Sequence, residues 1–454
     1  MAEKKIDEKE NLGGKVNKKR IIFTFLLFIT VASAGIFIGR WSGMGAEGEG
    51  YEELKVFTEA FSLVRKNYVE EAKPKDLIYG AIKGMLSALD PHSGFLTPDA
   101  YKDMQAETRG EFGGIGIQIG IKDGMLTVIA PIEDTPAYKA GIKAGDKIIK
   151  INNEFTKDMG LHDAVTKMRG LPKTSVTISI LREGWKEPKD FNIVREIIKI
   201  KSVKSKLLED DIGYVKINQF QEQTAADLSA ALEKLSQEKM NSLILDLRNN
   251  PGGLLNSAVD VAGRFLPPDK LVVYIKGRKG DRTEYFTEKD GTTYDIPMIV
   301  LVNEGSASAS EIVAGALKDW NRAVILGTKT FGKGSVQSVI PLSDGSGLRL
   351  TTAIYYTPKG TSIQATGIVP DIVVKLESKE KGKAHPVIRE EDLERHLKNN
   401  KDVIQQDIIQ EEEQPKEPEE MVPVEIEEKE DTQLQRAIDL LKTWRIFKEL
   451  PKAS

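Results

Sequence analysis

The alternation of apolar and polar residues divides the chain into stretches of different character. Residues 51–105 carry apolar side chains at helical spacing, as in "YEELKVFTEAFSLVRKNYV", which predicts an N-terminal helical region. Residues 106–186 contain short β-rich runs such as "GGIGIQIGIKDGMLTVIAPI" and "SVTISILREG", with one helix at "GLHDAVTKMRG", which predicts a compact module. Residues 190–376 alternate strand, glycine-containing turn and helix, which predicts an α/β core.

The N-terminal stretch predicts a membrane anchor. Residues 21–39 form a run of nineteen uncharged residues, long enough for a spanning helix. Residues 1–20 end in a basic cluster, which predicts that this end is cytoplasmic and that the rest of the chain lies outside the cytoplasm. The expected location is therefore the cell membrane, with a single pass. The alternative is a secretory signal cleaved after "ASA" at 32–34, which would release an exported protein.

The C-terminal part is predicted to be a charged linker followed by a helix. The linker is placed at 377–431, because residues 411–430 hold ten Glu and three Pro, a composition that cannot pack a core. Residues 432–450 are predicted to form an amphipathic helix that docks on another part of the protein. Its apolar face comprises Leu434, Ile438, Leu441, Trp444 and Phe447.

Composition excludes several classes of site. The formal net charge is only -4, which argues against a nucleic-acid partner. No cysteine is present, so disulfides, thiolate metal sites and a cysteine nucleophile are excluded. With only four histidines, a histidine-based metal site has little to draw on, and no cofactor is expected. His92, in the turn "DPHSG", is interpreted as structural.

The stretch "ILGTKTFGKGSVQ" raises the hypothesis of a phosphate-binding loop. Gly327, Gly332 and Lys333 have the required spacing, but Gly334 stands where such a loop has the Ser or Thr that holds magnesium. The β-branched residues that follow, ending at Pro341, predict a strand instead of the helix that a phosphate site needs. A nucleotide-binding ATPase is therefore the weaker hypothesis, and Lys333 requires another role.

The stretch "VNEGSASASEIVAGALKDW" places three serines at the start of a predicted helix. A serine there is often only an N-cap, but it is also where first-turn N–H groups can stabilise an oxyanion. Without a nearby histidine, the available base is a neutral lysine, and Ser-Lys pairs are an established variant of serine catalysis. If the strands before the serines and before Lys333 are neighbours, both groups meet at one sheet edge. Ser306, Ser308 and Ser310 remain equivalent on this argument.

Taken with "GTKTFGKGSVQ", the serine-rich motif closely resembles the C-terminal processing, or tail-specific, serine peptidases. The resemblance extends over about 51–376 and implies a crotonase-like (ClpP-like) α/β peptidase core with an inserted PDZ domain. It implies that Ser308 is the nucleophile, that Lys333 is the general base, and that Gln337 orients the lysine.

The same resemblance assigns an oxyanion site. "LDLRNNPGG" matches the glycine-rich oxyanion loop of these peptidases, so Gly252 or Gly253, with the amide of Ala309, would bind the oxyanion.

The β-rich module resembles a PDZ domain, which binds a C-terminal tail as an added strand beside a helix. Gly114 and Gly116 would turn backbone amides toward the terminal carboxylate, and Ile115 and Ile117 would line an apolar pocket. Arg169, at the end of the helix, would couple occupancy of the groove to the catalytic glutamine, although a solvated helix-end arginine is an equal alternative.

The predicted activity is ATP-independent endopeptidase cleavage through an acyl-enzyme. The expected substrates are exported or membrane proteins with exposed apolar C-terminal tails, and a homo-oligomer through the terminal helical regions is a further possibility. The alternative from a different class is a non-catalytic PDZ scaffold that retains the peptidase fold. The presence of Ser308, Lys333 and Gln337 together argues against the scaffold.

Overall fold

The computed structural model describes six stretches of the chain, and these divide into two units that meet in sequence at Ile82 and Lys83. The stretches are residues 50–122, 124–157, 159–289, 293–375, 388–399 and 430–449. Within them no helix has the length and apolar character that a membrane crossing requires. The predicted spanning segment 21–39 lies outside the described residues.

The first unit contains the predicted helical region. Helix α2 spans Tyr51–Asn67, and α3, Pro74–Ser87, begins in this unit and ends in the second. Helix α2 buries none of its residues, and its apolar side chains include Leu54 and Leu63, which are 59% and 52% exposed. This helix therefore presents an apolar surface that the described chain does not cover.

The second unit begins with a turn and a helix that lead into the PDZ-like module. Strand β1, Gly94–Leu96, is followed by α4, Pro98–Arg109, whose start is capped by the Thr97 side chain. Helix α4 ends at Gly110, which has a φ of 75° and meets the side chain of Gln221 so closely that a Cβ would clash. Only glycine fits this turn.

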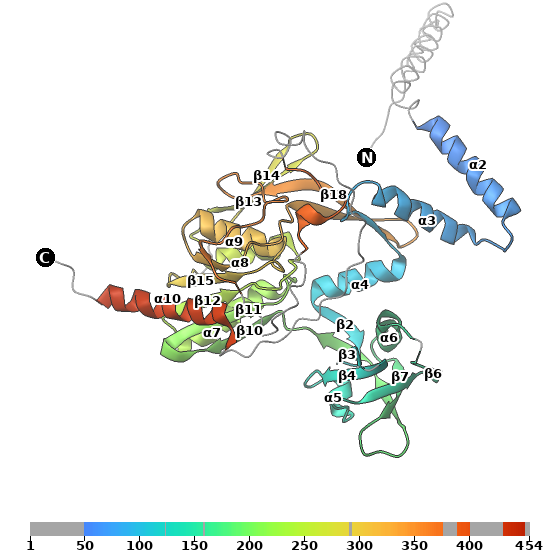
Figure 1. Cartoon of the computed structure of the whole chain (residues 1–454), viewed down its shortest axis with the longest axis horizontal. Coiled ribbons are helices and arrows are strands. Elements are labelled where there is room, and N and C mark those ends of the chain that lie inside the picture. The colour runs from blue at the N-terminus through green and yellow to red at the C-terminus, as the bar shows by residue number, and fades with distance from the viewer. Residues whose placement is uncertain are drawn as a thin grey trace, which may run out of the picture. The chain divides into compact units, whose positions relative to one another are not determined.

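The β-rich module is an antiparallel sheet of order β3-β4-β5-β7-β8, with β6 paired to β5. Two helices, α5 and α6, accompany it (Figure 1). Strand β3 is an edge strand, and α6 packs against it, so the module has the edge and helix that a PDZ groove requires. The bounds are β3 Ile117–Lys122, β4 Met125–Pro131, α5 Pro136–Lys139, β5 Lys147–Ile151, β6 Glu154–Phe155, α6 Leu161–Met168 and β7 Ser175–Leu181.

The module extends beyond the boundary at 186 that the sequence texture suggested. Strand β8, Lys189–Val194, pairs with β7 along its whole length. Strand β9, Glu196–Lys199, then pairs with β2, Glu111–Gly114. The chain segments that lead into and out of the module are therefore joined as a two-stranded antiparallel sheet. The predicted boundary followed the last β-rich run that the sequence pattern showed, "SVTISILREG", whereas a further paired strand follows after a hairpin loop at 182–188.

The α/β core is built on a six-stranded sheet of order β10-β11-β12-β15-β16-β19. All neighbouring pairs are parallel except β10 with β11. Helices α7, α8 and α9 connect the strands. The bounds are β10 Val203–Leu207, η1 Glu209–Asp211, β11 Ile212–Ile217, α7 Thr224–Gln237, β12 Ser242–Asp246, α8 Leu255–Gly263, β15 Met298–Val302, α9 Ala309–Asp319, β16 Val324–Gly327 and β19 Ile372–Val373.

The two faces of this sheet are covered by different parts of the chain (Figure 1). Alternate strand residues such as Leu245 and Val300 pack with α7, α8 and α9 in the main core. The intervening residues, such as Ile244 and Leu301, pack with Leu434, Ala437 and Leu441 of α10, Thr432–Glu449. The predicted C-terminal helix therefore docks on the sheet through these residues, whereas Trp444 and Phe447 of its predicted apolar face stay exposed.

A second, antiparallel sheet carries the strand that follows the lysine loop. Strand β18 pairs with β1, β13 and β17, and β14 extends the sheet beyond β13. The segment after Lys333 is thus a strand, and the phosphate-loop hypothesis is wrong because no helix starts there. The bounds are β13 Leu271–Gly277, β14 Arg282–Phe286, β17 Ser335–Pro341 and β18 Gly347–Tyr356.

Part of the predicted linker 377–431 is packed against the core. Residues 388–399 contain the one-turn helix η2, Glu390–Asp392, and both Glu390 and Asn399 are buried. Asn399 donates to the carbonyl oxygen of Gln364 at 3.0 Å. The acidic, proline-containing composition that predicts a linker is confined to residues 411–430. Residues 388–399 instead bury polar groups that have hydrogen-bond partners in the core.

Candidate active site

Three loops that follow adjacent parallel strands form the candidate active site. Strands β12, β15 and β16 lie side by side, so their carboxyl ends meet at one edge of the sheet. The loop after β12 carries "RNNPGG", the loop after β15 carries the three serines, and the loop after β16 carries Lys333. The strands before the serines and before the lysine are neighbours, as the Ser-Lys argument required.

Ser308 occupies the N-cap of α9 in a strained conformation. Its φ of 53° and ψ of -113° lie outside the regions that residues with a Cβ ordinarily adopt. Strain of this kind persists only where surrounding contacts hold it, and it is concentrated at functional sites. The backbone N–H of Ser308 donates to Glu311 Oε2 at 2.8 Å, which anchors the strained turn to the helix.

The structure separates the three serines that the sequence left equivalent. Ser306 and Ser310 are fully buried, and their hydroxyl groups donate to the carbonyl oxygens of Leu247 and Asn250 at 2.8 and 2.9 Å. Ser308 alone of the three is partly exposed. Two serines therefore fasten the serine loop to the glycine loop, and Ser308 is the one that a substrate can reach.

Glu311 connects the serine loop to the lysine loop. Its side chain is completely buried, and Oε2 accepts from both Ser308 N and Lys333 N, at 2.8 and 2.9 Å. Oε1 accepts from the Thr330 hydroxyl at 2.6 Å and from Gly332 N at 2.8 Å. Burial raises the pKa of Glu311 to about 7, although all four donors favour the carboxylate.

Lys333 lies in an environment that favours the neutral amine. Burial lowers the pKa of its side chain, and nearby Arg349 lowers the pKa further, whereas Glu390, Glu311 and Asp90 oppose the shift. No hydrogen bond joins its Nζ to the Ser308 hydroxyl in the described part of the chain.

The glycine loop closes over the serine from the side of β12. Gly252 has a φ of 102°, and a Cβ at this position would lie 2.8 Å from Ser308 Cβ and 2.9 Å from Ala309 N. Its own N–H donates to Asn250 Oδ1 at 2.9 Å. In the described chain the N–H groups of Gly253 and Ala309 have no acceptor, so these two are available to an oxyanion.

Among the described residues, no hydrogen bond joins Gln337 to Lys333. Its amide donates to Ser335 Oγ at 3.0 Å and to Thr351 Oγ1 at 3.4 Å, both within the second sheet. Gln337 lies four residues along from Lys333 on β17, so it is close in the chain but its amide group is held elsewhere.

Tyr355 is a residue near Ser308 that the sequence pattern did not indicate. It lies on β18, is 1% exposed, and donates its backbone N–H to the carbonyl oxygen of Gly334 at 2.9 Å. Burial raises the pKa of its hydroxyl group, which lies near the Ser308 side chain without completing a hydrogen bond. Glu311 was also missed, although the spacing S-x-x-E of a capping box was visible in the sequence.

The residues predicted for the PDZ groove lie at the start of the module. Gly114 ends β2, and Ile117 begins β3. Ile115 is almost fully buried in the core of the module. Gly116 has a φ of 76° and packs against Thr135, which donates its hydroxyl to the Gly116 carbonyl oxygen at 3.0 Å. This turn directs the chain into the edge strand, which is the position of a carboxylate-binding loop in a PDZ groove.

Arg169 contacts the elements that lead into the module. It caps the end of α6, and its guanidinium group lies over the Phe112 ring at 4.6 Å from the centroid. A long ion pair of 4.0 Å joins it to Asp103 of α4. No contact joins Arg169 to Gln337 among the described residues.

A buried ionic cluster links the glycine loop to the C-terminal helix. Arg248 makes paired hydrogen bonds to Asp431, Nη1 to Oδ1 at 2.8 Å and Nη2 to Oδ2 at 2.7 Å. It also bonds both carboxylate oxygens of Asp246, at the end of β12. Asp431 directly precedes α10, so the docked helix helps to fix the backbone from which the glycine loop starts.

Known proteins resemble this chain over most of its length. The sequence profile of Peptidase family S41 matches residues 211–374, that of the PDZ domain matches 127–182, and that of the Activating protease CtpB N-terminal domain matches 41–100. The Carboxy-terminal-processing protease of Bartonella bacilliformis is 45% identical over 390 residues, which cover 85% of this chain and 89% of that protein. Carboxy-terminal processing protease CtpB of Bacillus subtilis is 37% identical over 335 residues, which cover 73% and 69%.

Among solved structures, the photosystem II D1 C-terminal processing protease is similar with 32% identity, covering 70% of this chain and 92% of that chain at a TM-score of 0.43.

Proposed function

The chain belongs to peptidase family S41 and is a C-terminal processing serine protease with a PDZ domain, and from this premise we propose that Ser308 and Lys333 carry its chemistry. One observation supports the pair above all others. The backbone N–H groups of both residues donate to the same oxygen of Glu311, at 2.8 and 2.9 Å, so two residues from different loops are fixed beside each other.

In the proposed reaction, neutral Lys333 accepts the proton of the Ser308 hydroxyl while Oγ attacks the carbonyl carbon of the scissile peptide bond. The N–H groups of Gly253 and Ala309 stabilise the oxyanion. Of the two glycines considered for this role, Gly253 is favoured, because the Gly252 N–H is already bonded to Asn250. The Lys333 ammonium then donates its proton to the leaving amine, and an acyl-enzyme forms on Ser308.

Hydrolysis of the acyl-enzyme repeats the same proton path with water. Lys333 takes a proton from the attacking water, and the ammonium returns it to Ser308 Oγ as the ester bond breaks. We propose that Gln337 orients the amine only after its amide leaves Ser335 and Thr351. The reaction needs no nucleotide.

We propose that the PDZ domain binds apolar C-terminal tails along β3. Recognition of protein C-termini through the PDZ domain follows from the family. The preference for apolar tails rests on Ile117, which is partly buried at the start of the edge strand, whereas Ile115, predicted to line the same pocket, lies in the core of the module. The coupling of the groove to catalysis through Arg169 rests on its position between α6 and the residues Phe112 and Asp103.

Cleavage of an unfolded protein with an apolar C-terminal tail, with and without ATP, tests this function. We expect cleavage in both conditions and none by Ser308→Ala. Absence of cleavage by a folded parent would favour the scaffold, and strict dependence on ATP would contradict the proposed mechanism.

We propose that the protein is held in the cell membrane by residues 21–39, with the catalytic part outside the cytoplasm. The alternative remains export after cleavage of a signal. Support comes from the uncharged stretch and its basic flank. Fractionation and protease accessibility of intact cells test the proposal, and protection of the PDZ region in intact cells would overturn the orientation.

We propose further that copies associate through their terminal helices. Within the described stretches nothing buries a residue of helix α2, and a groove of 680 Å³ beside α10 is lined by Trp444 and Phe447, which are 46% and 68% exposed. Sedimentation of the parent and of Phe447→Glu measures the effect. A parent that is monomeric at micromolar concentration would contradict the proposal.

A further inference from the structure

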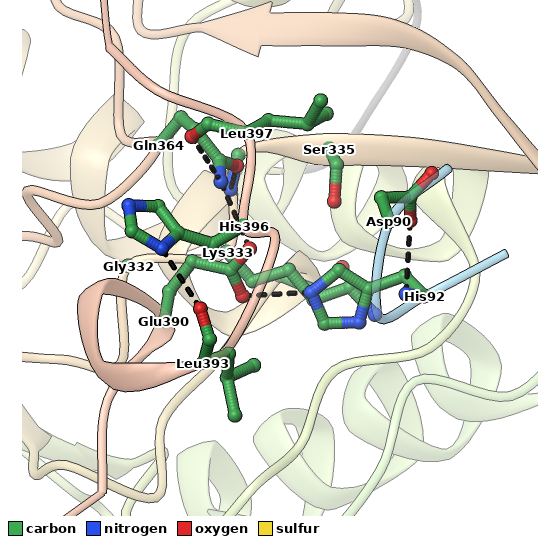
Figure 2. Close-up of polar contacts among 12 residues, drawn as sticks. Asp90, His92, Gly332, Lys333, Ser335, Gln364, Glu390, Leu393, His396 and Leu397 are labelled. Atoms are coloured by element: carbon green, nitrogen blue, oxygen red, sulfur yellow. Dashed lines mark hydrogen bonds and ion pairs between the residues drawn. The ribbon is translucent and has the colours of Figure 1, made fainter. Parts of the chain in front are cut away.

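Glu390 is a buried carboxylate that the mechanism above does not use. It lies in η2, and its side chain is 0% exposed. One oxygen, Oε2, lies 2.7 Å from His92 Nε2, and the other, Oε1, accepts from Gln364 Nε2 at 2.8 Å. Figure 2 shows these side chains converging around Lys333 from three segments of the chain. A carboxylate buried this completely is costly without such partners.

Gln364 connects Glu390 by hydrogen bonds to the loop that carries Lys333, here called the lysine loop. Its Oε1 accepts from the backbone N–H of Gly334 at 2.9 Å, directly after Lys333. The backbone of Glu390 adds a second connection, because its N–H donates to the Phe331 carbonyl oxygen at 3.2 Å. The lysine is therefore fixed on one side by Glu311 and on the other by the pair of Glu390 and Gln364.

The lysine loop packs closely against the segment that carries Gln364. A Cβ on Gly334 would lie 2.5 Å from Gln364 N, and a Cβ on Gly332 would lie 3.2 Å from Gly367 N. The carbonyl oxygen of Gly332 accepts from Ala365 N at 2.9 Å. A displacement of Gln364 would consequently move the lysine loop itself.

Charged groups from four elements face Lys333. They are Arg349 on β18, Glu311 on α9, Asp90 in the turn before β1, and Glu390 on η2. The carboxylate of Glu390 raises the pKa of Lys333, whose amine would become an ammonium on accepting the serine proton. A negative charge at this place stabilises that ammonium.

We propose that Glu390 is a positioning residue for Lys333, which holds the lysine loop through Gln364 and stabilises the ammonium that forms during attack. His92, which the sequence analysis took as structural, has a specific place in this arrangement as the second partner of the buried carboxylate. The inference rests on the proposed role of Lys333 as the general base.

The substitution Glu390→Gln separates charge from hydrogen bonding. The glutamine can still accept from Gln364 and donate to His92, so the loop keeps its shape while the charge is lost. The pKa of Lys333 should then fall, because one of the groups that raise it is removed. The acid limb of kcat/KM should move to lower pH by about 0.5 to 1 unit, and the plateau kcat should fall about 3-fold to 10-fold.

Glu391→Gln is the matched control. Glu391 belongs to the same one-turn helix and pairs with Lys329 at 3.1 Å, but its side chain is 44% exposed. Glu391→Gln removes one negative charge, as Glu390→Gln does, but from an exposed side chain. The pH profile of kcat/KM should therefore stay unchanged. Glu390→Ala, which also removes the hydrogen bonds, should lower kcat at least about 10-fold with little change in KM.

The experiment measures kcat and KM of the full-length proteins across pH with one unfolded substrate, with thermal melts to check folding. If Glu390→Ala does not fold, the comparison of the two glutamine variants decides alone. An acid limb that does not move in Glu390→Gln, or that moves equally in Glu391→Gln, would overturn the inference. Lys333→Ala is measured in parallel, because activity in that variant would contradict the proposed function itself.

Discussion

Glu311 and Asp431 are two buried carboxylates at the same end of the core sheet, and their pKa values shift in opposite directions. Glu311 receives two backbone N–H groups on one oxygen and an N–H and a hydroxyl on the other, and burial raises its pKa to about 7. Burial would also raise the pKa of Asp431, but the paired bonds from Arg248 outweigh it, and the net shift is downward.

The difference shows what each cluster can do. Neutral donors orient a carboxylate without compensating fully for its desolvation, whereas a guanidinium group does compensate. A cation bonded to Glu311 would make a strong ion pair, but if that cation were Lys333, the lysine could not serve as a base. Glu311 therefore fixes Lys333 through the backbone N–H of the lysine. Arg248 stabilises the fold through ion pairs with carboxylates such as Asp431.

The largest effect is expected at the lysine. Lys333→Arg should reduce kcat/KM by about 10³-fold or more, as should Lys333→Ala, because a guanidinium group keeps its proton and cannot act as a base. Activity of the parent should rise with pH, since the lysine must be neutral. Steady-state cleavage with folding controls measures this. Substantial activity in folded Lys333→Arg would show that the residue acts as a positive charge.

A smaller loss is expected from Glu311→Gln. An amide offers one acceptor oxygen, so one pair of donors, either at Ser308 and Lys333 or at Thr330 and Gly332, would face an NH₂ group. We expect kcat to fall about 10²-fold, because unmade buried hydrogen bonds cost about 1–3 kcal/mol each and the two loops lose their common anchor. Glu304→Gln, a partly exposed acid bonded to Thr328 at 2.8 Å, is the matched control. Equal activity of both variants would contradict the bridging role.

The pH dependence of the free energy of unfolding of Glu311→Gln tests the raised pKa of Glu311. The pKa of Glu311 is raised from 4.5 to about 7, so its contribution to the free energy of unfolding is fully present below pH 4.5 and is lost as the pH rises to about 7. Glu311→Gln should lack this dependence. Urea unfolding at several pH values between 4.5 and 7 measures the difference, and parallel curves for parent and variant would show that Glu311 has no raised pKa.

The Arg248 cluster should affect stability more than chemistry. Asp431→Ala leaves a buried guanidinium group with fewer partners and should lower the free energy of unfolding by about 3 kcal/mol. The pKa of Asp431 lies below its ordinary value of 3.8, so this contribution is present above pH 3.8 and is lost as the pH falls through the folded pKa. Asp439→Ala, at an exposed acid on the helix α10 that follows Asp431, is the control. Identical denaturation midpoints for the two variants would refute the claim.

The smallest effect is expected in the PDZ domain. Arg169→Ala removes a cation–π contact with Phe112 and a long ion pair, and it should lower turnover of a tail-bearing protein about 3-fold to 10-fold. A short peptide that bypasses the groove should be affected differently. The control is Lys167→Ala, on the helix α6 that Arg169 caps, which breaks an ion pair with Glu154 of β6. Equal responses of both substrates to Arg169→Ala would exclude coupling between groove and site.

Local sequence patterns were sufficient for the elements and the family. The β-branched run up to Pro341 predicted the strand β17, and helical spacing predicted α2 and α10. The motifs around Ser308 and Lys333 indicated the C-terminal processing peptidases, and relatives at 45% and 37% identity confirm that family. These features depend on residues close together in the chain, where steric preference and periodicity act directly.

The polar partners of the site were decided only by tertiary structure. Ser306 and Ser308 are alike in sequence, but the packing of β12 beside β15 brings an acceptor to Ser306 and leaves Ser308 accessible. The bonds from Arg248 to Asp431 and from His92 to Glu390 join residues separated by 183 and 298 positions. Periodicity shows that a face is buried, but it carries no information on which distant polar group meets that face, because this depends on strand order and loop packing.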